Sequence, residues 1–134
     1  MKKQTKIIIG IVALIIIIAG VFLAKYLTSV QEYQNSVKNM TYENVDASGV
    51  PDGTYIGECD VDFIYAKVFV TVENGIITNV DLLEHHHERG TAAEGIEQQI
   101  VNEQRIDVDS ISGATNSSTV IKKAVDNALS SAQQ

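Results

Sequence analysis

An uninterrupted apolar segment near the N-terminus constrains this 134-residue chain more than any other feature. Residues 7–24 are 18 consecutive uncharged residues, most of them Ile, Val, Leu or Ala. As a helix they would cover roughly 27 Å at about 1.5 Å per residue, close to the thickness of a bilayer's hydrocarbon core. The segment is long for the apolar part of a cleaved signal peptide, and no clear small-x-small cleavage site follows it. We therefore predict a transmembrane anchor, with a cleaved signal peptide or a buried globular helix as the alternatives.

The distribution of charge predicts the orientation of this anchor. Lys2, Lys3 and Lys6 precede the apolar segment, whereas only Lys25 follows it closely. This bias predicts a cytoplasmic tail at residues 1–6 and a domain outside the cell membrane. Beyond residue 25 the chain holds six basic residues against all 17 acidic ones, a net charge of −11. Such a domain is a poor candidate for binding nucleic acid or anionic headgroups, and membrane lipid is expected as a partner because of the anchor.

The chain after the anchor divides at a strong turn signal. From Leu27 to Met40 apolar residues recur at three- to four-residue steps, which suggests a short amphipathic helix, and residues 41–50 are polar without a pattern. We interpret residues 25–50 as a stalk and linker. Pro51-Asp52-Gly53 predicts a turn, and we place the start of the domain, residues 51–134, there.

A β-meander is predicted for the first part of the domain. Thr54–Asp60 and Tyr65–Val72 are rich in β-branched and aromatic residues, and the second run alternates with a period of two. Asn74-Gly75 is the pair that a two-residue type I′ hairpin turn favours, and Ile76–Leu83 is the predicted return strand.

Helices are predicted for the second part of the domain. A polar loop at Glu84–Gly90 precedes a helix from Ala92 to about Gln104, a short strand or extended segment at Asp107–Ile111, and a final helix over Ser118–Leu129. Strands followed by helices predict the α+β class: an N-terminal transmembrane helix, then a small domain with a twisted antiparallel sheet and flanking helices.

One stretch of the sequence, Asp109 to Ser118, is suited to bind a phosphate. Gly113 and Ala114 permit close approach to the backbone, and Asn116, Ser117 or Ser118 is a candidate N-cap for the final helix. The N–H groups of a helix's first turn favour an anion. The hydroxyl of Thr115 is suited either to donate a hydrogen bond to a phosphate or to be bonded to it covalently. An ordinary strand-to-helix turn uses the same residue types, so composition alone leaves both interpretations open.

The order of these residues resembles a known motif. Asp109-Ser110-Ile111-Ser112-Gly113-Ala114-Thr115 resembles the Asp-x-x-Ser-Gly-Ala-Thr flavinylation motif of the FMN-binding domain family. That family includes flavin-carrying components of the sodium-pumping NADH:quinone reductase and of the Rnf electron-transfer complex. Residues 52–57 look like the family's opening Asp-Gly-x-Tyr-x-Gly, and residues 70–77 look like its central hairpin. The resemblance covers residues 52–129 or so.

The resemblance implies a covalent flavin. In the family a flavin transferase uses FAD and a divalent metal ion to move FMN onto the last Thr of the motif, here Thr115, as a phosphoester. Asp109 matches the position that the transferase requires. The residues implied to frame the phosphate are Ser112, Gly113, Ala114, Asn116 and Ser117. Tyr55, Tyr65 and Phe63 are candidates for stacking on the flavin ring, although each also suits a sheet core.

Three consecutive histidines, His85, His86 and His87, mark a departure from the family pattern. Many members carry Glu-His-x-Glu-Thr-Pro-Gly here, and this chain keeps the first histidine and the glycine but lacks the proline. Consecutive residues point in different directions, so we expect no metal site at these histidines. We interpret the run instead as a loop lining the flavin pocket, with His85 toward the cofactor. Cys59, the single cysteine, is expected to be a half-buried strand residue, with a redox thiol as the alternative.

The function that this resemblance implies is electron transfer at the outer face of the membrane. The donor would be a membrane dehydrogenase or quinol, and the acceptor another flavoprotein, a haem protein or an extracellular compound. The sequence shows no substrate-specific catalytic acid or base, so we expect a carrier or a subunit of a redox system and not a stand-alone enzyme. A non-covalent FMN-binding module and a non-redox surface or assembly domain are the alternatives.

Overall fold

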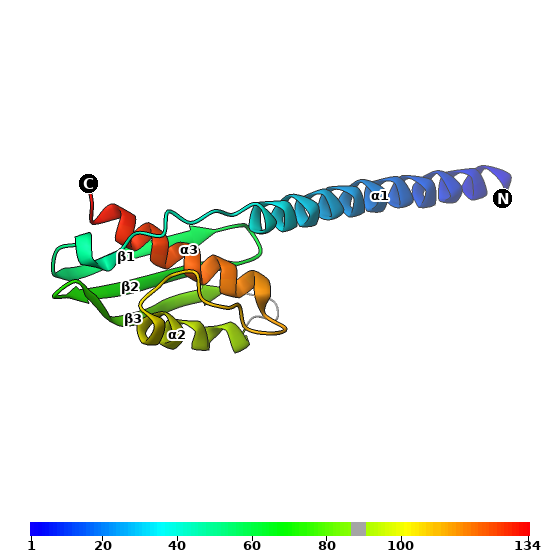
Figure 1. Cartoon of the computed structure of the whole chain (residues 1–134). Helices are drawn as coiled ribbons and strands as arrows, with labels where there is room; N and C mark the ends of the chain where they lie inside the picture. The colour runs from blue at the N-terminus through cyan, green and yellow to red at the C-terminus, as the bar shows by residue number, and fades with distance from the viewer. Residues whose placement is uncertain (87–90) are drawn as a thin grey trace. The chain divides into compact units, whose positions relative to one another are not determined.

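A computed structural model describes residues 1–86 and 91–134, which form two compact units, 1–35 and 36–134. The first unit is a single helix, α1, whose full extent is Lys2–Lys38 (Figure 1). α1 has no break at residue 25, so the predicted anchor and the predicted stalk helix are continuous. By length and composition α1 is able to cross a membrane, and none of its apolar window is buried within the protein.

The second unit contains the predicted meander. β1 (Gly53–Asp60), β2 (Tyr65–Glu73) and β3 (Ile76–His86) form an antiparallel sheet in the order β1-β2-β3. The hairpin turn is confirmed, because Asn74 and Gly75 have φ angles of 54° and 74°, as a type I′ turn requires.

β3 is longer than the sequence predicts. Glu84, His85 and His86 pair with Lys67, Ala66 and Tyr65, so the predicted polar loop is wrong for these three residues. Main-chain pairing to β2 does not depend on side-chain polarity, and a strand with one solvated face tolerates polar residues. The remainder of that loop, residues 87–90, lies outside the described residues.

The helical half also differs from the prediction in its boundaries. The helix expected from Ala92 begins as a 3₁₀ turn, Thr91–Gly95, and continues as α2, Ile96–Glu103. The segment 107–111 is extended and pairs with no described strand. The final helix, α3, spans Thr115–Ser131 and so begins three residues before the predicted Ser118. The α+β class, an apolar helix followed by a three-stranded antiparallel sheet with flanking helices, is confirmed.

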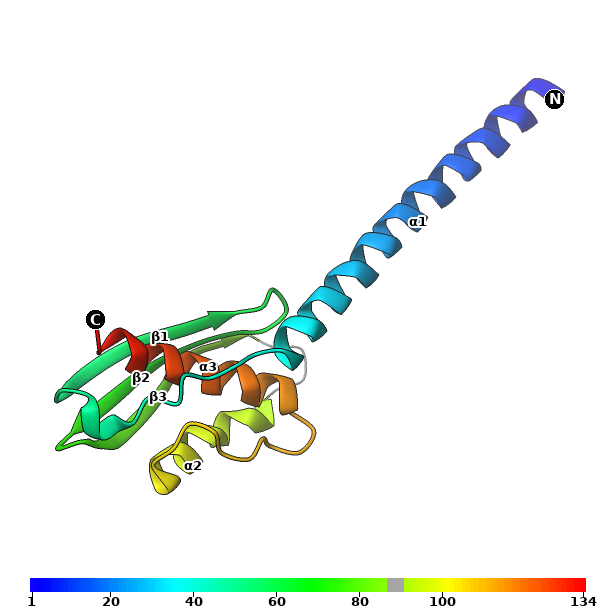
Figure 2. The same ribbon diagram turned by 45° about the horizontal axis from the view of Figure 1, so that its top comes forward.

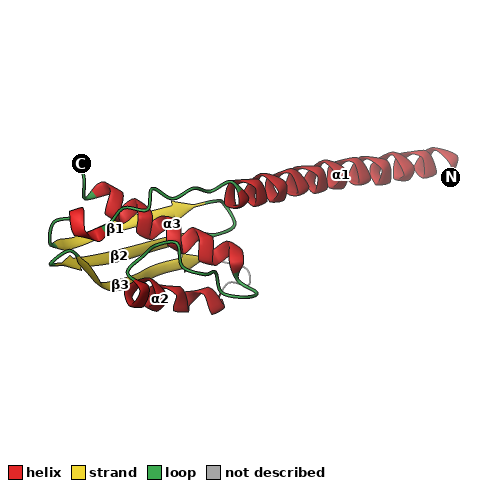
Figure 3. Ribbon diagram, in the orientation of Figure 1, coloured by secondary structure: helices red, strands yellow, loops and turns green. Residues whose placement is uncertain are grey.

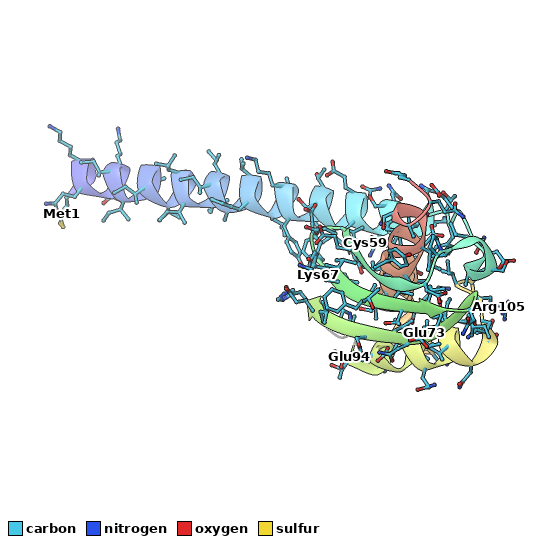
Figure 4. The ribbon with its side chains drawn as sticks, turned by 90° about the vertical axis from the view of Figure 1, so that its left-hand side faces the viewer. Met1, Cys59, Lys67, Glu73, Glu94 and Arg105 are labelled. Atoms are coloured by element: carbon cyan, nitrogen blue, oxygen red, sulfur yellow. The ribbon has the colours of Figure 1, made fainter. Side chains whose placement is uncertain are left out.

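The two helices of the domain cover one face of the sheet. α3 packs across β1 and β2, and α2 lies along β3 (Figures 1 and 2). The β2 residues facing these helices, Ala66, Val68, Val70 and Val72, are fully buried. Lys67 points away from the helices on the opposite face, which no described helix covers (Figure 4). The result is a two-layer domain whose connection from α2 to α3 is a long loop, drawn in green in Figure 3.

The segment between α1 and β1 also packs on α3. The backbone N–H groups of Glu43 and Asn44 donate to the two carboxylate oxygens of Asp126, at 2.9 and 3.0 Å. A short 3₁₀ turn, Ala47–Gly49, follows, and both Ala47 and Val50 are buried. Residues 42–50, which the sequence predicted as a linker, therefore pack with the domain that was predicted to begin at residue 51.

Candidate functional site

Thr115 is the first residue of α3 and is exposed to solvent. Its hydroxyl makes no hydrogen bond to any other residue that the structure describes. The N-cap is Ala114 and not the predicted Asn116, Ser117 or Ser118, because the helix starts three residues earlier. Ala114 has no side-chain oxygen to cap the helix, so the positive end of the helix dipole is directed toward the surface at Thr115.

The turn before Thr115 explains why the motif requires glycine. The N–H of Ala114 donates to the carbonyl of Ile111 at 3.0 Å, and Gly113, the third residue of this turn, has a φ of +81°. A turn of this kind favours glycine at that position, because other residues are strained at positive φ. No other atom lies within 4 Å of where a Gly113 side chain would begin, so the backbone is accessible.

Ser118 holds this turn against the helix. Its Oγ accepts a hydrogen bond from the N–H of Ile111 at 3.0 Å and donates to the carbonyl of Ala114 at 2.8 Å, and the side chain is fully buried. Ser118 was a candidate cap in the sequence; the structure instead gives it the role of fixing the motif's turn.

Ser117 and His85 meet although they are 32 residues apart. His85 Nε2 lies 3.1 Å from Ser117 Oγ, and His85 Nδ1 lies 3.2 Å from Glu94 Oε1. The His85 side chain is only 2% exposed. A carboxylate only accepts hydrogen bonds, so Nδ1 carries a proton toward Glu94. In the neutral imidazole Nε2 then accepts from the Ser117 hydroxyl. Glu94 was not predicted, since only the fold brings the 3₁₀ turn before α2 to the end of β3.

The histidines do not point in one direction. His85 faces the buried side of the sheet, whereas the His86 side chain is 72% exposed and lies 3.6 Å from Glu84. His87 lies outside the described residues. Within residues 1–86 and 91–134, no group of three His, Cys, Asp or Glu is arranged to hold a metal ion.

The remaining predicted residues lie at different distances from the motif. Asp109 is exposed and contributes to raising the pKa of Arg105, after the larger effect of the Arg105 hydrogen bond to Glu103. Tyr55 lies away from the motif. It pairs with Val70 on β2, which pairs with Val80 on β3, and Val80 is five residues along β3 from His85. Five residues correspond to roughly 17 Å at about 3.3 Å per residue.

The Tyr55 hydroxyl donates instead to the carbonyl of Pro51, at 2.6 Å. Tyr65, by contrast, pairs with His86 at the end of the sheet that holds His85, and Phe63 lies in the adjacent β1–β2 connection. Of the three aromatic candidates, Tyr65 and Phe63 are therefore at the end of the sheet nearest the motif.

Cys59 lies on β1, opposite Ala66, and is partly buried, as expected. Burial raises the pKa of its thiol to about 11. Since the thiolate is the reactive form, this environment does not favour a redox role at neutral pH.

Comparison with known families agrees with the motif. Residues 65–130 match the family model described as the FMN-binding domain. The match begins at β2, includes the hairpin, both domain helices and the motif, and leaves out residues 52–57, which lie at the start of β1 and just before it. No curated protein matches the chain. Residues 65–130, and with them the motif that ends at Thr115, belong to the FMN-binding domain family.

Proposed function

We propose that this protein is a membrane-anchored electron carrier that holds FMN through a phosphoester bond to Thr115. The observation that carries the proposal is the exposed Thr115 hydroxyl, unbonded to other described residues, at the N-terminus of α3. When bound, FMN supplies reversible one- and two-electron chemistry at its isoalloxazine ring.

The residues of the motif fit a phosphate group. The α3 N-terminus favours negative charge, and Gly113 leaves the approach to the backbone open. The motif's phosphate-facing residues would be Ser112, Gly113, Ala114, Asn116 and Ser117. His85 fixes the Ser117 hydroxyl through its hydrogen bond, so it supports this turn from within the domain.

Attachment requires a modifying enzyme. A flavin transferase with a bound divalent metal ion would use FAD as the donor and recognise Asp109. In this transfer a bond between Thr115 Oγ and the FMN phosphorus would form, the phosphoanhydride bond to the departing AMP would break, and the hydroxyl proton would pass to a base of the transferase.

The anchor supports a location at the membrane, and the lysines before it support a domain outside the cytoplasm. A covalent bond is advantageous there, because FMN that dissociates outside the cell is lost. The electron donor would be a membrane dehydrogenase or quinol, and the acceptor a second redox protein or an extracellular compound.

The test is to coexpress the full chain with a flavin transferase and to measure its intact mass and visible absorbance in detergent. We expect the mass to increase by one FMN less one water, with flavin absorbance that persists after denaturation and filtration. Thr115→Ala should abolish both signals, while Thr115→Ser, which keeps a hydroxyl, should retain some attachment.

Two other outcomes point to the alternative functions. Yellow protein that loses its flavin on denaturation would indicate non-covalent binding. Colourless protein at its unmodified mass, beside a transferase shown to be active on another substrate, would rule out both flavin functions and favour a surface or assembly domain.

A further inference from the structure

A buried lysine on α3, the helix that carries Thr115, contacts the segment 107–110, where the motif begins. Lys122 lies on α3, and only 6% of its side chain is exposed. Its Nζ donates to the carbonyl of Val108 at 2.9 Å and to the Oγ of Ser110 at 3.4 Å, and lies 3.8 Å from the Asp107 carboxylate. Asp107 and Val108 directly precede the motif that ends at Thr115, and Ser110 is its second residue.

The surroundings of Lys122 are suited to a positive charge. Removing an ammonium group from water is unfavourable unless its donors and its charge are matched. Besides the three partners above, the ring of Tyr42 lies 5.4 Å from Nζ, within the range of a cation–π interaction. Tyr42 belongs to the segment before β1, so three parts of the chain meet around one cation.

An apolar residue would be the ordinary choice at this position of α3. Lys122 falls four residues after Ser118 and three before Val125, both fully buried, on the stripe that faces the domain core. Methionine or leucine would avoid the desolvation of a charge there. The reason for a lysine at this position therefore lies in the segment that its polar contacts hold, residues 107–110.

That segment depends on side chains for its position. Residues 107–110 pair with no described strand. The Val108 N–H donates to the Ile106 carbonyl, and this backbone hydrogen bond lies within the loop itself. Val108 is buried and Asp109 is exposed, as expected for successive residues of an extended chain. Lys122 contacts the residues on both sides of Asp109 and so fixes the backbone from which that carboxylate extends.

We propose that Lys122 is a positioning residue for flavin attachment, which holds residues 108–110 against α3 so that Asp109 and Thr115 reach the transferase in one fixed arrangement. The inference rests on the proposed function and adds a residue outside the motif to it. Lys122 acts through Val108 and Ser110.

The experiment measures the rate of FMN transfer to the full chain in detergent, with purified flavin transferase, FAD and Mg²⁺. Initial rates of covalent flavin formation are recorded over a range of chain concentrations. Lys122→Met keeps the length of the side chain but removes the ammonium group. We expect kcat/KM to fall at least about tenfold, since a buried carbonyl loses a charged donor and the recognised loop loosens.

The matched control is Lys123→Met, the same change at the next residue. Lys123 Nζ bonds Asp126 at 2.9 Å and none of the residues 107–110. This variant should transfer FMN at the rate of the unmodified sequence. Hydrogen exchange gives the second measurement: Lys122→Met should lose protection at the Ile111 and Ala114 amides and retain it in the second half of α3.

Three results would overturn the inference. One is a folded Lys122→Met variant modified at the normal rate, and another is an equal loss of rate in Lys123→Met. If Lys122→Met does not fold, Lys122→Gln takes its place, because it also removes the ammonium group but keeps a polar side chain, and a normal rate in that variant would overturn the inference in the same way. Failure of both variants to fold would assign Lys122 to overall stability. Because the unchanged chain is measured in the same assay, its failure to accept FMN would identify a failure of the proposed function itself.

Discussion

Three hydroxyl residues in the first turn of α3 have different environments although they are close in sequence. Thr115 is exposed, Ser117 is 2% exposed and hydrogen-bonded to His85, and Ser118 is fully buried and holds the preceding turn. An α-helix advances about 100° per residue, so residues two and three positions apart face different directions. Among these three, only Thr115 is exposed, so the proposed modification would be specific to its hydroxyl.

Glu97, on α2, is the residue for which the structure makes the clearest pH-dependent prediction. Its Oε2 is buried and has no hydrogen-bond partner among the described residues. Burial raises the pKa of Glu97 above its ordinary value of 4.5, and the nearby charge of Glu94 adds to the effect. A carboxyl whose pKa is raised on folding contributes stability below about pH 4.5 that is lost as the pH rises.

We therefore expect Glu97→Gln to stabilise the protein at pH 7 and to have little effect at pH 4. The gain should be under about 1 kcal/mol, because the residue is only partly buried and solvent screens its charge. Thermal unfolding followed by circular dichroism at both pH values provides the measurement. Glu103→Gln in the same helix removes the pair with Arg105 at 2.7 Å and serves as the control, with no gain expected at pH 7. A gain from Glu97→Gln of equal size at pH 4 would contradict this account.

At the scale of elements, the domain depends on how closely α3 approaches β1. A side chain begun at Gly57 would overlap the carbonyl oxygen of Ala124 and lie 2.6 Å from the backbone nitrogen of Ala128. The small residues Gly57, Ala124 and Ala128 thus allow two backbones to touch. Because α3 is one continuous helix, this contact also helps to fix the position of its first residue, Thr115.

Gly57→Ala should accordingly destabilise the domain by about 3 kcal/mol, at the upper end of the usual effect of overpacking. Urea unfolding of the full chain in detergent measures the change. Gly95→Ala is the control, because nothing lies within 4 Å of a side chain there and its φ of −91° suits alanine. A Gly57→Ala protein as stable as Gly95→Ala would show that the two backbones separate without cost.

A second element-scale contact joins α3 to the segment before β1. Asp126 is fully buried and accepts hydrogen bonds from the N–H groups of Glu43 and Asn44, and from Lys123. Asp126→Ala leaves those two N–H groups without acceptors, so we expect a loss of about 3 kcal/mol in the free energy of unfolding. Asn127→Ala, at the next position, removes only an exposed bond to the Glu58 carbonyl and should cost under about 1 kcal/mol. Equal losses in the two variants would disprove the special role of Asp126.

At the scale of the whole molecule, the chain combines a strongly apolar helix with an acidic domain. The proposed orientation rests on Lys2, Lys3 and Lys6, which precede the apolar segment. The −11 charge of the chain beyond residue 25 gives no attraction to anionic headgroups, so α1 alone would hold the protein at the membrane.

A reporter enzyme at the C-terminus tests this orientation. Alkaline phosphatase, which is active only outside the cytoplasm, should be active when fused after Gln134. Substituting Gln for all three of Lys2, Lys3 and Lys6 removes the positive charges that precede the anchor. This change should lower the phosphatase activity several-fold. Phosphatase that is inactive in the original fusion would indicate the opposite orientation, and the export argument for a covalent flavin would then fail.

The sequence by itself determined the features that depend on local chemistry. The length of residues 7–24, the alternation in β2 and the Asn74-Gly75 pair each specify their structure through neighbouring residues. A helix over residues 7–24, the antiparallel order of the meander and the turn were found as predicted. The family was likewise predicted from the order of residues in the motif, and the match over residues 65–130 confirms it.

Only the tertiary structure decided where elements end and which distant residues meet. β3 continues through His86 because β2 supplies pairing partners, and α3 starts at Thr115 because Ser118 holds the turn before it. The contacts of His85 with Ser117, and of Lys122 with Val108, join residues that no sequence pattern relates. The physical reason is that local signals come from neighbours along the chain, whereas the surroundings of Thr115 are built by contacts between segments far apart in it.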